Sequence, residues 1–134
     1  MLSVLVIDDE ADVRDGMKRV LERAGFSVRV MDNACDAMPE LRRLPADIVI
    51  TDIIMPKLSG VEAIAAILGE FPATGILAIS GGGNFDMTSY QSSAITTTTY
   101  LAAAKKAGAQ ATLTKPFESR ELIQAVELVI AGRA

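Results

Sequence analysis

Short apolar runs alternate along this chain with longer segments whose apolar residues recur at helical spacing. The short runs cover residues 3–7, 26–30, 47–51, 75–80 and 111–114. The helical pattern covers residues 11–24, 34–44, 60–68, 100–106 and 118–131. A continuous apolar run is typical of a strand buried on both faces, and its alternation with helices favours βαβ units. We therefore predict one α/β domain with a five-stranded parallel sheet and five helical segments.

Several local signals refine this prediction. Gly25 stands where a glycine commonly ends a helix, and Asn33 is a plausible N-cap for the second helix. Pro39 lies in the early turns of that helix, which weakens the prediction of where it begins. Cys35 is predicted to be a small buried or half-buried residue on the same helix. For the third helix, the predicted inward residues are Val61, Ile64, Ala65 and Leu68.

Composition excludes several classes of protein. The chain has 134 residues with 13 basic and 17 acidic side chains, a net charge of −4, and no basic patch that would indicate nucleic-acid binding. No apolar run approaches the roughly 20 residues needed to cross a bilayer. A single cysteine fits a reducing compartment, so we expect a cytoplasmic protein. From the charge and the short apolar runs, we expect that it binds neither nucleic acid nor membrane. The absence of histidine excludes histidine-ligated zinc and a phosphohistidine on this chain.

Charged residues stand at the ends of three predicted strands. Asp8 and Asp9 follow the first strand, Asp52 follows the third, and Lys115 follows the fifth. In an open parallel sheet, functional groups gather beyond the carboxyl ends of the strands. Carboxylates held close together repel one another unless a cation balances them. The pattern therefore predicts a cluster of three carboxylates balanced by one lysine and a divalent metal.

Such a cluster suits the transfer of a phosphoryl group to a carboxylate. The task is to position the phosphorus and to neutralise charge on its oxygens, and Mg²⁺ suits that task because it binds carboxylates and phosphates. We predict Asp52 as the phosphoacceptor, with Lys115 and the Ser80 hydroxyl contacting the phosphate oxygens. The predicted magnesium ligands are Asp8, Asp9, Asp52 and the backbone carbonyl of Ile54.

The order and spacing of these residues resemble the receiver domain of two-component response regulators over essentially the whole chain. The matching segments are residues 6–10, 52–60, 79–81, 108–109 and 115–117. The resemblance implies one receiver domain over residues 1–134, of the stand-alone type, with a flavodoxin-like fold and strand order 2-1-3-4-5. It also implies a cis peptide bond between Lys115 and Pro116. Its implied partners are a histidine kinase or phosphotransfer protein and a downstream protein target, and the implied state is a monomer or a phosphorylation-dependent dimer.

Three features depart from the pattern of that family. Thr112 occupies a position where the family often has an aromatic residue that moves on phosphorylation. Ile54 replaces a polar residue that could orient water, so we expect a long-lived phosphoaspartate. The interval from Ser80 to Lys115 is 35 positions, longer than the common pattern. We place the extra residues within about 84–98 and interpret them as a loop that becomes ordered on phosphorylation or partner binding, with residues 81–83 as a flexible hinge.

Other functions compete with a phosphorylation switch. An aspartate-nucleophile phosphatase would place an Asp-x-Asp pair after the first strand, whereas the acids here are adjacent. A docking module that works without phosphorylation is suggested by Thr112 and by the long interval before Lys115. A flavin-binding module is conceivable from the fold alone, although a fold does not fix a function. We expect a signalling switch rather than an enzyme, with chemistry confined to its own Asp52.

Overall fold

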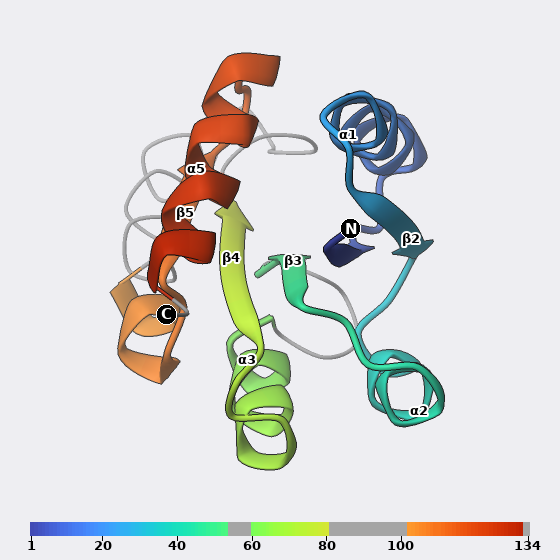
Figure 1. The fold of residues 1–134 in the computed structure, drawn as a ribbon. Coiled ribbons are helices and arrows are strands. Elements are labelled where there is room, and N and C mark those ends of the chain that lie inside the picture. The colour runs from blue at the N-terminus through green and yellow to red at the C-terminus, as the bar shows by residue number, and fades with distance from the viewer. Residues whose placement is uncertain (54–59, 81–101, 133–134) are drawn as a thin grey trace.

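The computed structural model describes residues 1–53, 60–80 and 102–132 and contains one five-stranded parallel sheet (Figure 1). The strand order is β2-β1-β3-β4-β5, as the family resemblance implied. The strands are β1 (Ser3–Ile7), β2 (Ser27–Met31), β3 (Ile48–Asp52), β4 (Gly75–Ser80) and β5 (Ala111–Thr114). The predicted bounds of β1, β4 and β5 are confirmed, and β2 and β3 each lie one residue further along the chain.

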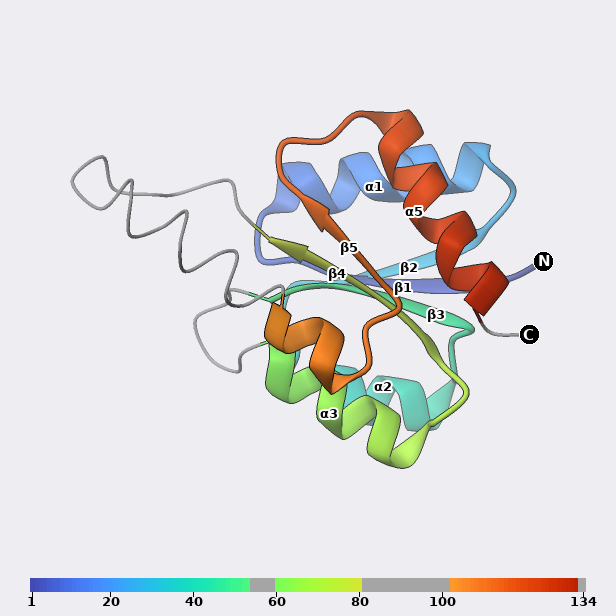
Figure 2. The same cartoon turned by 90° about the vertical axis from the view of Figure 1, so that its left-hand side faces the viewer.

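Helices cover both faces of the sheet. They are α1 (Ala11–Arg23), α2 (Ala37–Arg43), α3 (Gly60–Glu70) and α5 (Ser119–Gly132), and residues 102–107 are also helical. Figure 2 shows α1 and α5 on one face, with α2, α3 and the helical residues 102–107 on the other. The doubly wound α/β fold is therefore confirmed. Within the described residues, no helix is both long and apolar enough to cross a bilayer.

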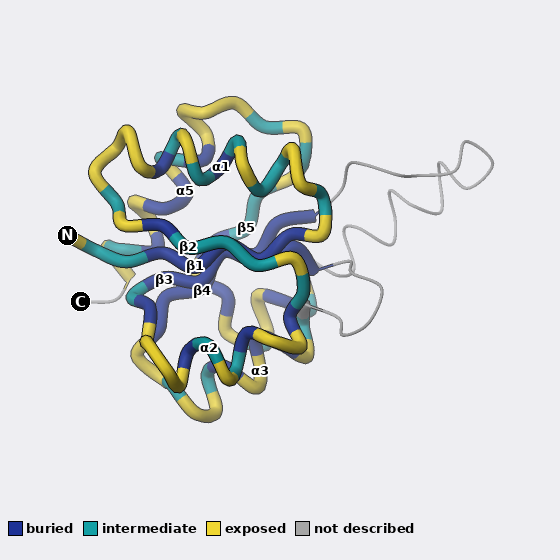
Figure 3. Tube along the Cα trace, turned by 90° about the vertical axis from the view of Figure 1, so that its right-hand side faces the viewer, coloured by how far each residue is buried: buried dark blue, intermediate teal, exposed yellow. Residues whose placement is uncertain are grey.

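Alternation along each strand builds two separate cores, one on each face of the sheet. In β1, Val4 and Val6 pack with α1 and α5, whereas Leu5 and Ile7 pack with α2 and α3. All four of these side chains are fully buried, and the central strands are buried along their length (Figure 3). Their sequences are therefore continuous apolar runs. This two-sided burial explains why the first strand could be recognised from its sequence.

Two helix ends show how local sequence sets the bounds. Gly25 follows α1 with a φ of +99°, its N–H donates to the Glu22 carbonyl, and the N–H of Phe26 donates to the Leu21 carbonyl. This pair of hydrogen bonds is the Schellman ending that favours glycine. The predicted start of α2 is wrong, because its N-cap is Asp36 rather than Asn33. Since α2 begins at Ala37, Pro39 lies in the first turn, where its missing N–H costs nothing.

Two predictions of burial are also wrong. Ala65 is exposed, and α3 buries Ala63, Ile64 and Ile67, with Val61 and Leu68 partly buried. Cys35 is exposed, because the turn before α2 places it outside the helix. The predicted hinge at residues 81–83 and the predicted loop at about residues 84–98 lie outside the described residues.

The carboxyl ends of the strands lie at one end of the molecule. In Figure 2 they point to the left, whereas the N-terminus and the final turn of α5 lie at the right. The charged residues that follow the strands are thereby collected at the end opposite the N-terminus and the final turn of α5.

Candidate functional site

Four neighbouring strands deliver the predicted site residues to the same edge of the sheet. Asp8 follows β1, Asp52 is the last residue of β3, Ser80 is the last residue of β4, and Lys115 follows β5. The parallel registers align these ends: Ile7 pairs with Thr51, and Asp52 pairs with Ile79. The Lys115 N–H donates to the Ser80 carbonyl over 2.8 Å, which extends the pairing of β4 and β5 by one residue.

Lys115 is the cation at the centre of this edge. Its Nζ donates a hydrogen bond of 2.8 Å to Asp52 Oδ2 and lies 3.0 Å from Asp8 Oδ2. A third contact, of 3.2 Å, joins Nζ to Glu10 Oε1. The lysine side chain is only 7% exposed. One buried ammonium therefore contacts three carboxylates that come from two different strand ends.

The carboxylates form a compact cluster of hard oxygen donors. Asp8, Asp9, Glu10 and Asp52 each offer an oxygen, and these oxygens all lie within 4.8 Å of one another. Asp8 and Asp52 are buried, Glu10 is half-buried and Asp9 is exposed. A single lysine cannot balance four carboxylates, and Mg²⁺ prefers ligands of this kind. The residues present therefore fit the acidic metal site that the sequence predicted.

The pKa values of Asp8 and Lys115 are both raised. This shift favours the neutral form of the Asp8 carboxyl and the charged form of the Lys115 amine. Burial raises the pKa of the Asp8 carboxyl above its ordinary value of 3.8, although the Glu10 N–H and Lys115 oppose this shift. For Lys115, burial alone would lower the pKa, but the hydrogen bond and charge of Asp52, together with Asp8, raise it above its ordinary value. The Lys115 amine is thus stabilised in its charged form, whereas burial makes the charged form of Asp8 unfavourable in free energy.

Ser80 contributes a buried hydroxyl to this edge of the sheet. The residue is 1% exposed, and its Oγ has no hydrogen-bond partner among the described residues. A buried hydroxyl without a partner carries a desolvation cost of about 1–3 kcal/mol. Thr112, on the strand beside it, is half-buried. The Ser80 hydroxyl is therefore suited to accept a new partner that enters the site.

The sequence prediction did not include Glu10 in the site. Glu10 is the N-cap residue of α1, but its side chain makes no capping hydrogen bond and reaches Lys115 instead. Glutamate is not a preferred N-cap residue. Its unfavourable place directly after Asp8 and Asp9 was the signal that could have identified it.

The other predicted features have mixed outcomes. Asp8, Asp9, Asp52 and Lys115 are brought together, and Ser80 ends the strand that lies between those of Asp52 and Lys115. The peptide bond between Lys115 and Pro116 is cis, as the resemblance implied. Ile54, with its predicted carbonyl ligand and its predicted effect on phosphoaspartate lifetime, lies outside the described residues.

Comparison with known proteins agrees with this geometry. The model of the response regulator receiver domain family matches residues 4–127. The chain is 31% identical to the chemotaxis protein CheY of Thermotoga maritima, over 94% of this chain and 95% of that protein. It is 28% identical to CheY of Listeria monocytogenes, with coverage of 95% and 97%. A response regulator receiver domain protein from Clostridium thermocellum superposes with a TM-score of 0.77 at 27% identity, covering 99% of this chain and 97% of that one.

The family match over residues 4–127 overturns the phosphatase alternative. The flavin-binding alternative rested on the fold alone, whereas the family match assigns the chain to the receiver domains. A receiver domain is a signalling component and not an enzyme that turns over external substrates. The acidic cluster at the strand ends, the lysine that contacts it and the family match agree. The chain belongs to the response regulator receiver domains of two-component signalling.

Proposed function

We propose that Asp52 accepts a phosphoryl group from the phosphohistidine of a histidine kinase or phosphotransfer protein, in the presence of Mg²⁺. The observation that carries this proposal is the contact of Lys115 Nζ with Asp52 Oδ2 inside a cluster of four carboxylates. Asp52 is the carboxylate of that cluster that ends a central strand, with a cation already beside it. The domain proposed for this role is the whole of residues 1–134.

The proposed magnesium ligands are Asp8, Asp9, Asp52 and the carbonyl of Ile54. The first three supply oxygens within 4.8 Å of one another, which supports the proposal. Bound Mg²⁺ would neutralise charge on the phosphoryl oxygens. Glu10 belongs to the same cluster, but its contact with Lys115 makes it a partner of the lysine in our proposal.

The reaction requires only one bond exchange. An oxygen of the Asp52 carboxylate attacks phosphorus, the new O–P bond forms as the N–P bond of phosphohistidine breaks, and the imidazole leaves with the electron pair of that bond. Lys115 holds an equatorial phosphoryl oxygen by hydrogen bonding and charge. The Ser80 hydroxyl, which has no hydrogen-bond partner among the described residues, donates to another phosphoryl oxygen.

The consequence of phosphorylation is a change of protein contacts. The phosphate adds charge and acceptor oxygens that draw Lys115 and Ser80 toward Asp52, and this biases a surface with two states. We propose that a downstream protein reads this surface, in the cytoplasm, and that the protein is a monomer or dimerises on phosphorylation.

Labelling by a small phosphodonor tests the proposal directly. The protein is incubated with MgCl₂ and phosphoramidate, and its intact mass is measured. One phosphate-sized increase is expected for the wild type and for Asp32→Ala, and none for Asp52→Ala. Asp32 is the matched control, because it follows β2 at the same sheet edge but lies outside the cluster. Labelling that persists in Asp52→Ala would reject Asp52 as the acceptor.

A docking module that ignores phosphorylation remains the second candidate, favoured by the half-buried Thr112 in place of an aromatic residue. The test measures how tightly the downstream protein target of this receiver binds to the Asp52→Asn variant. Binding equal to that of the phosphorylated wild type would favour the docking module, whereas loss of the phosphorylation-dependent increase favours the switch.

A further inference from the structure

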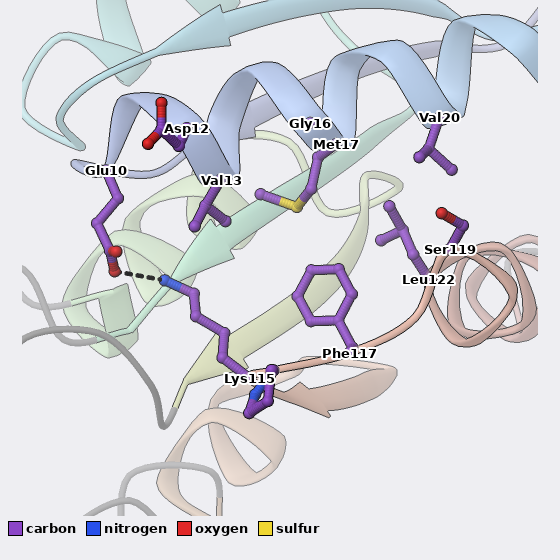
Figure 4. A pocket seen from close by; sticks show the side chains of 11 residues that line it. Glu10, Asp12, Val13, Gly16, Met17, Val20, Lys115, Phe117, Ser119 and Leu122 are labelled. Carbon is purple, nitrogen blue, oxygen red and sulfur yellow. Dashed lines mark hydrogen bonds and ion pairs between the residues drawn. The ribbon is translucent and has the colours of Figure 1, made fainter.

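A pocket of about 380 Å³ lies beside the acidic cluster, between α1 and the segment that joins β5 to α5 (Figure 4). Val13, Met17 and Val20 line it from α1, and Phe117 and Leu122 line it from the opposite side. In Figure 4 these side chains point toward one another across the space. A concave site of this size that combines apolar side chains with a few polar groups is the usual form of a small-molecule site.

Gly16 opens the wall of this pocket at the middle of α1. A glycine inside a helix is destabilising relative to alanine. Packing does not require it here, since a Cβ added at Gly16 would meet no atom within 4 Å. Gly16 nevertheless lines the pocket, where it leaves the helix backbone open. A ligand that approaches the backbone closely is a physical reason for a glycine at such a position.

The polar end of the pocket is acidic. Glu10 and Asp12 both line it, and the Glu10 side chain is 31% exposed. Asp12 has no ion pair or hydrogen bond through its carboxylate among the residues that the structure describes. Among the described residues that line the pocket, Lys115 is the only cation, and its charge is shared by Glu10, Asp8 and Asp52. The charge that this end presents to a ligand is therefore negative.

We propose that this pocket binds an organic cation with an apolar body, of the arylalkylammonium class. The apolar part would lie between Met17 and Phe117, passing over Gly16, with the ammonium group toward Glu10 and Asp12. The pocket adjoins the phosphorylation site and shares Glu10 and Lys115 with it. A bound ammonium group would compete with Lys115 for Glu10, and this links the pocket to the acidic cluster.

The test compares three probes with the same apolar body and different charge: 4-phenylbutylammonium, 4-phenylbutanol and 4-phenylbutanoate. Each is titrated into protein labelled with ¹³C at the methionine methyl groups, without metal or phosphodonor. The Met17 signal is assigned with a Met17→Leu variant. We expect a saturable shift of the Met17 methyl with the cation, binding at least about threefold weaker with the alcohol, and weaker still with the carboxylate.

Substitutions at glycine localise the binding. Gly16→Phe fills the pocket and should abolish the shift, whereas Gly16→Ala should retain it. Gly69→Phe is the matched control, because a Cβ at Gly69 on α3 also meets no atom within 4 Å and Gly69 is outside the pocket. Asp12→Asn should weaken binding of the cation about twofold to threefold and leave that of the alcohol unchanged.

Contacts in the wild type provide a measurement that does not depend on any variant. Intermolecular NOEs from the phenyl ring to Met17 and Phe117 are expected. The proposal is overturned by absence of saturable binding, by equal or tighter binding of the alcohol or the carboxylate, or by a shift that persists in a folded Gly16→Phe variant. Because no phosphoryl transfer is involved, failure of Asp52 labelling would leave this result unaffected.

Discussion

Asp8 is a fully buried carboxylate, and its position carries a cost at neutral pH. Burial raises its pKa, so the folded protein binds the Asp8 proton more tightly than the unfolded chain does. The unfolding free energy therefore falls as pH rises from the ordinary value of 3.8 through the raised pKa in the folded protein. Contacts with the Glu10 N–H and Lys115 offset only part of this cost.

Asp8→Asn should therefore stabilise the metal-free protein at pH 7 and weaken its binding of Mg²⁺. The amide keeps an oxygen that can accept from the Glu10 N–H, while the charge that burial penalises is removed. Urea unfolding in EDTA at pH 4 and pH 7 measures the first effect, and the gain should be larger at pH 7. Asp32→Asn, an exposed change at the same sheet edge, is the control. A variant less stable than the wild type at pH 7 would contradict the assignment of cost to Asp8.

Among single residues, the sequence was most informative where a charged side chain stands at a position for which the packing of the fold gives no reason. Asp52 and Lys115 could be recognised because a charge at the end of a buried strand is costly unless it serves a site. Glu10 is not a preferred N-cap residue, but it was missed because the sequence alone does not show what its side chain contacts. Its contact with Lys115 joins residues that are 105 positions apart, and no local pattern encodes that distance.

Among the elements, β2 and α2 are joined by an ionic network around Glu40. Arg29 of β2 donates to Glu40 Oε2 over 2.6 Å and to the Leu44 carbonyl over 2.7 Å, so it caps the end of α2. Arg43 also pairs with Glu40, one helical turn away. The hydrogen bonds from Arg43 and Arg29 lower the pKa of Glu40 from 4.5 to about 2.

The Glu40 network should make stability depend on pH in the acid range. A carboxyl whose pKa is depressed in the folded state contributes stability above its ordinary pKa of 4.5, and this is lost as pH falls through about 2. Glu40→Gln should therefore lower stability at pH 6 and flatten the decline between pH 4.5 and 2. Unfolding free energies across that range test this, with the exposed Glu127→Gln as control. Parallel pH curves for Glu40→Gln and the wild type would show that the network contributes nothing.

The elements differ in how well their sequences predict them. The strands β1, β4 and β5 have the predicted bounds, because charged or turn residues at both ends of each apolar run mark where the strand begins and ends. The buried face of α3 was only partly predicted, because Ala63 and Ala65 are alike in sequence and only packing distinguishes them. The start of α2 was misplaced because Asn33 and Asp36 are both acceptable caps. The pocket beside α1 was not predicted at all, because α1 and α5 meet only in the folded chain.

For the whole molecule, occupation of the acidic cluster should be linked to global stability. A ligand that binds only the folded state stabilises it by about 2.7 kcal/mol when its concentration is 100 times its dissociation constant. We expect Mg²⁺ at that excess to raise the unfolding free energy of the wild type by this amount, since it relieves repulsion among four carboxylates. Asp52→Asn should gain markedly less at the same concentration.

Urea unfolding with and without MgCl₂ is the measurement, with ionic strength matched by NaCl so that general screening is the same in both samples. An equal gain in the wild type and in Asp52→Asn would mean that the cation acts elsewhere on the molecule, and it would remove Asp52 from the ligand set.

The N-terminus and the final turn of α5 lie at the end of the sheet opposite the acidic cluster (Figure 2). A fluorophore, biotin or surface tether attached at the N-terminus, where Met1 is exposed, would therefore leave the carboxyl edge facing solution. An immobilised sample could then be exposed in turn to metal, phosphodonor, kinase and amine on one biosensor chip. The same attachment would orient every molecule alike, so a loss of response could be assigned to the site and not to blocked access.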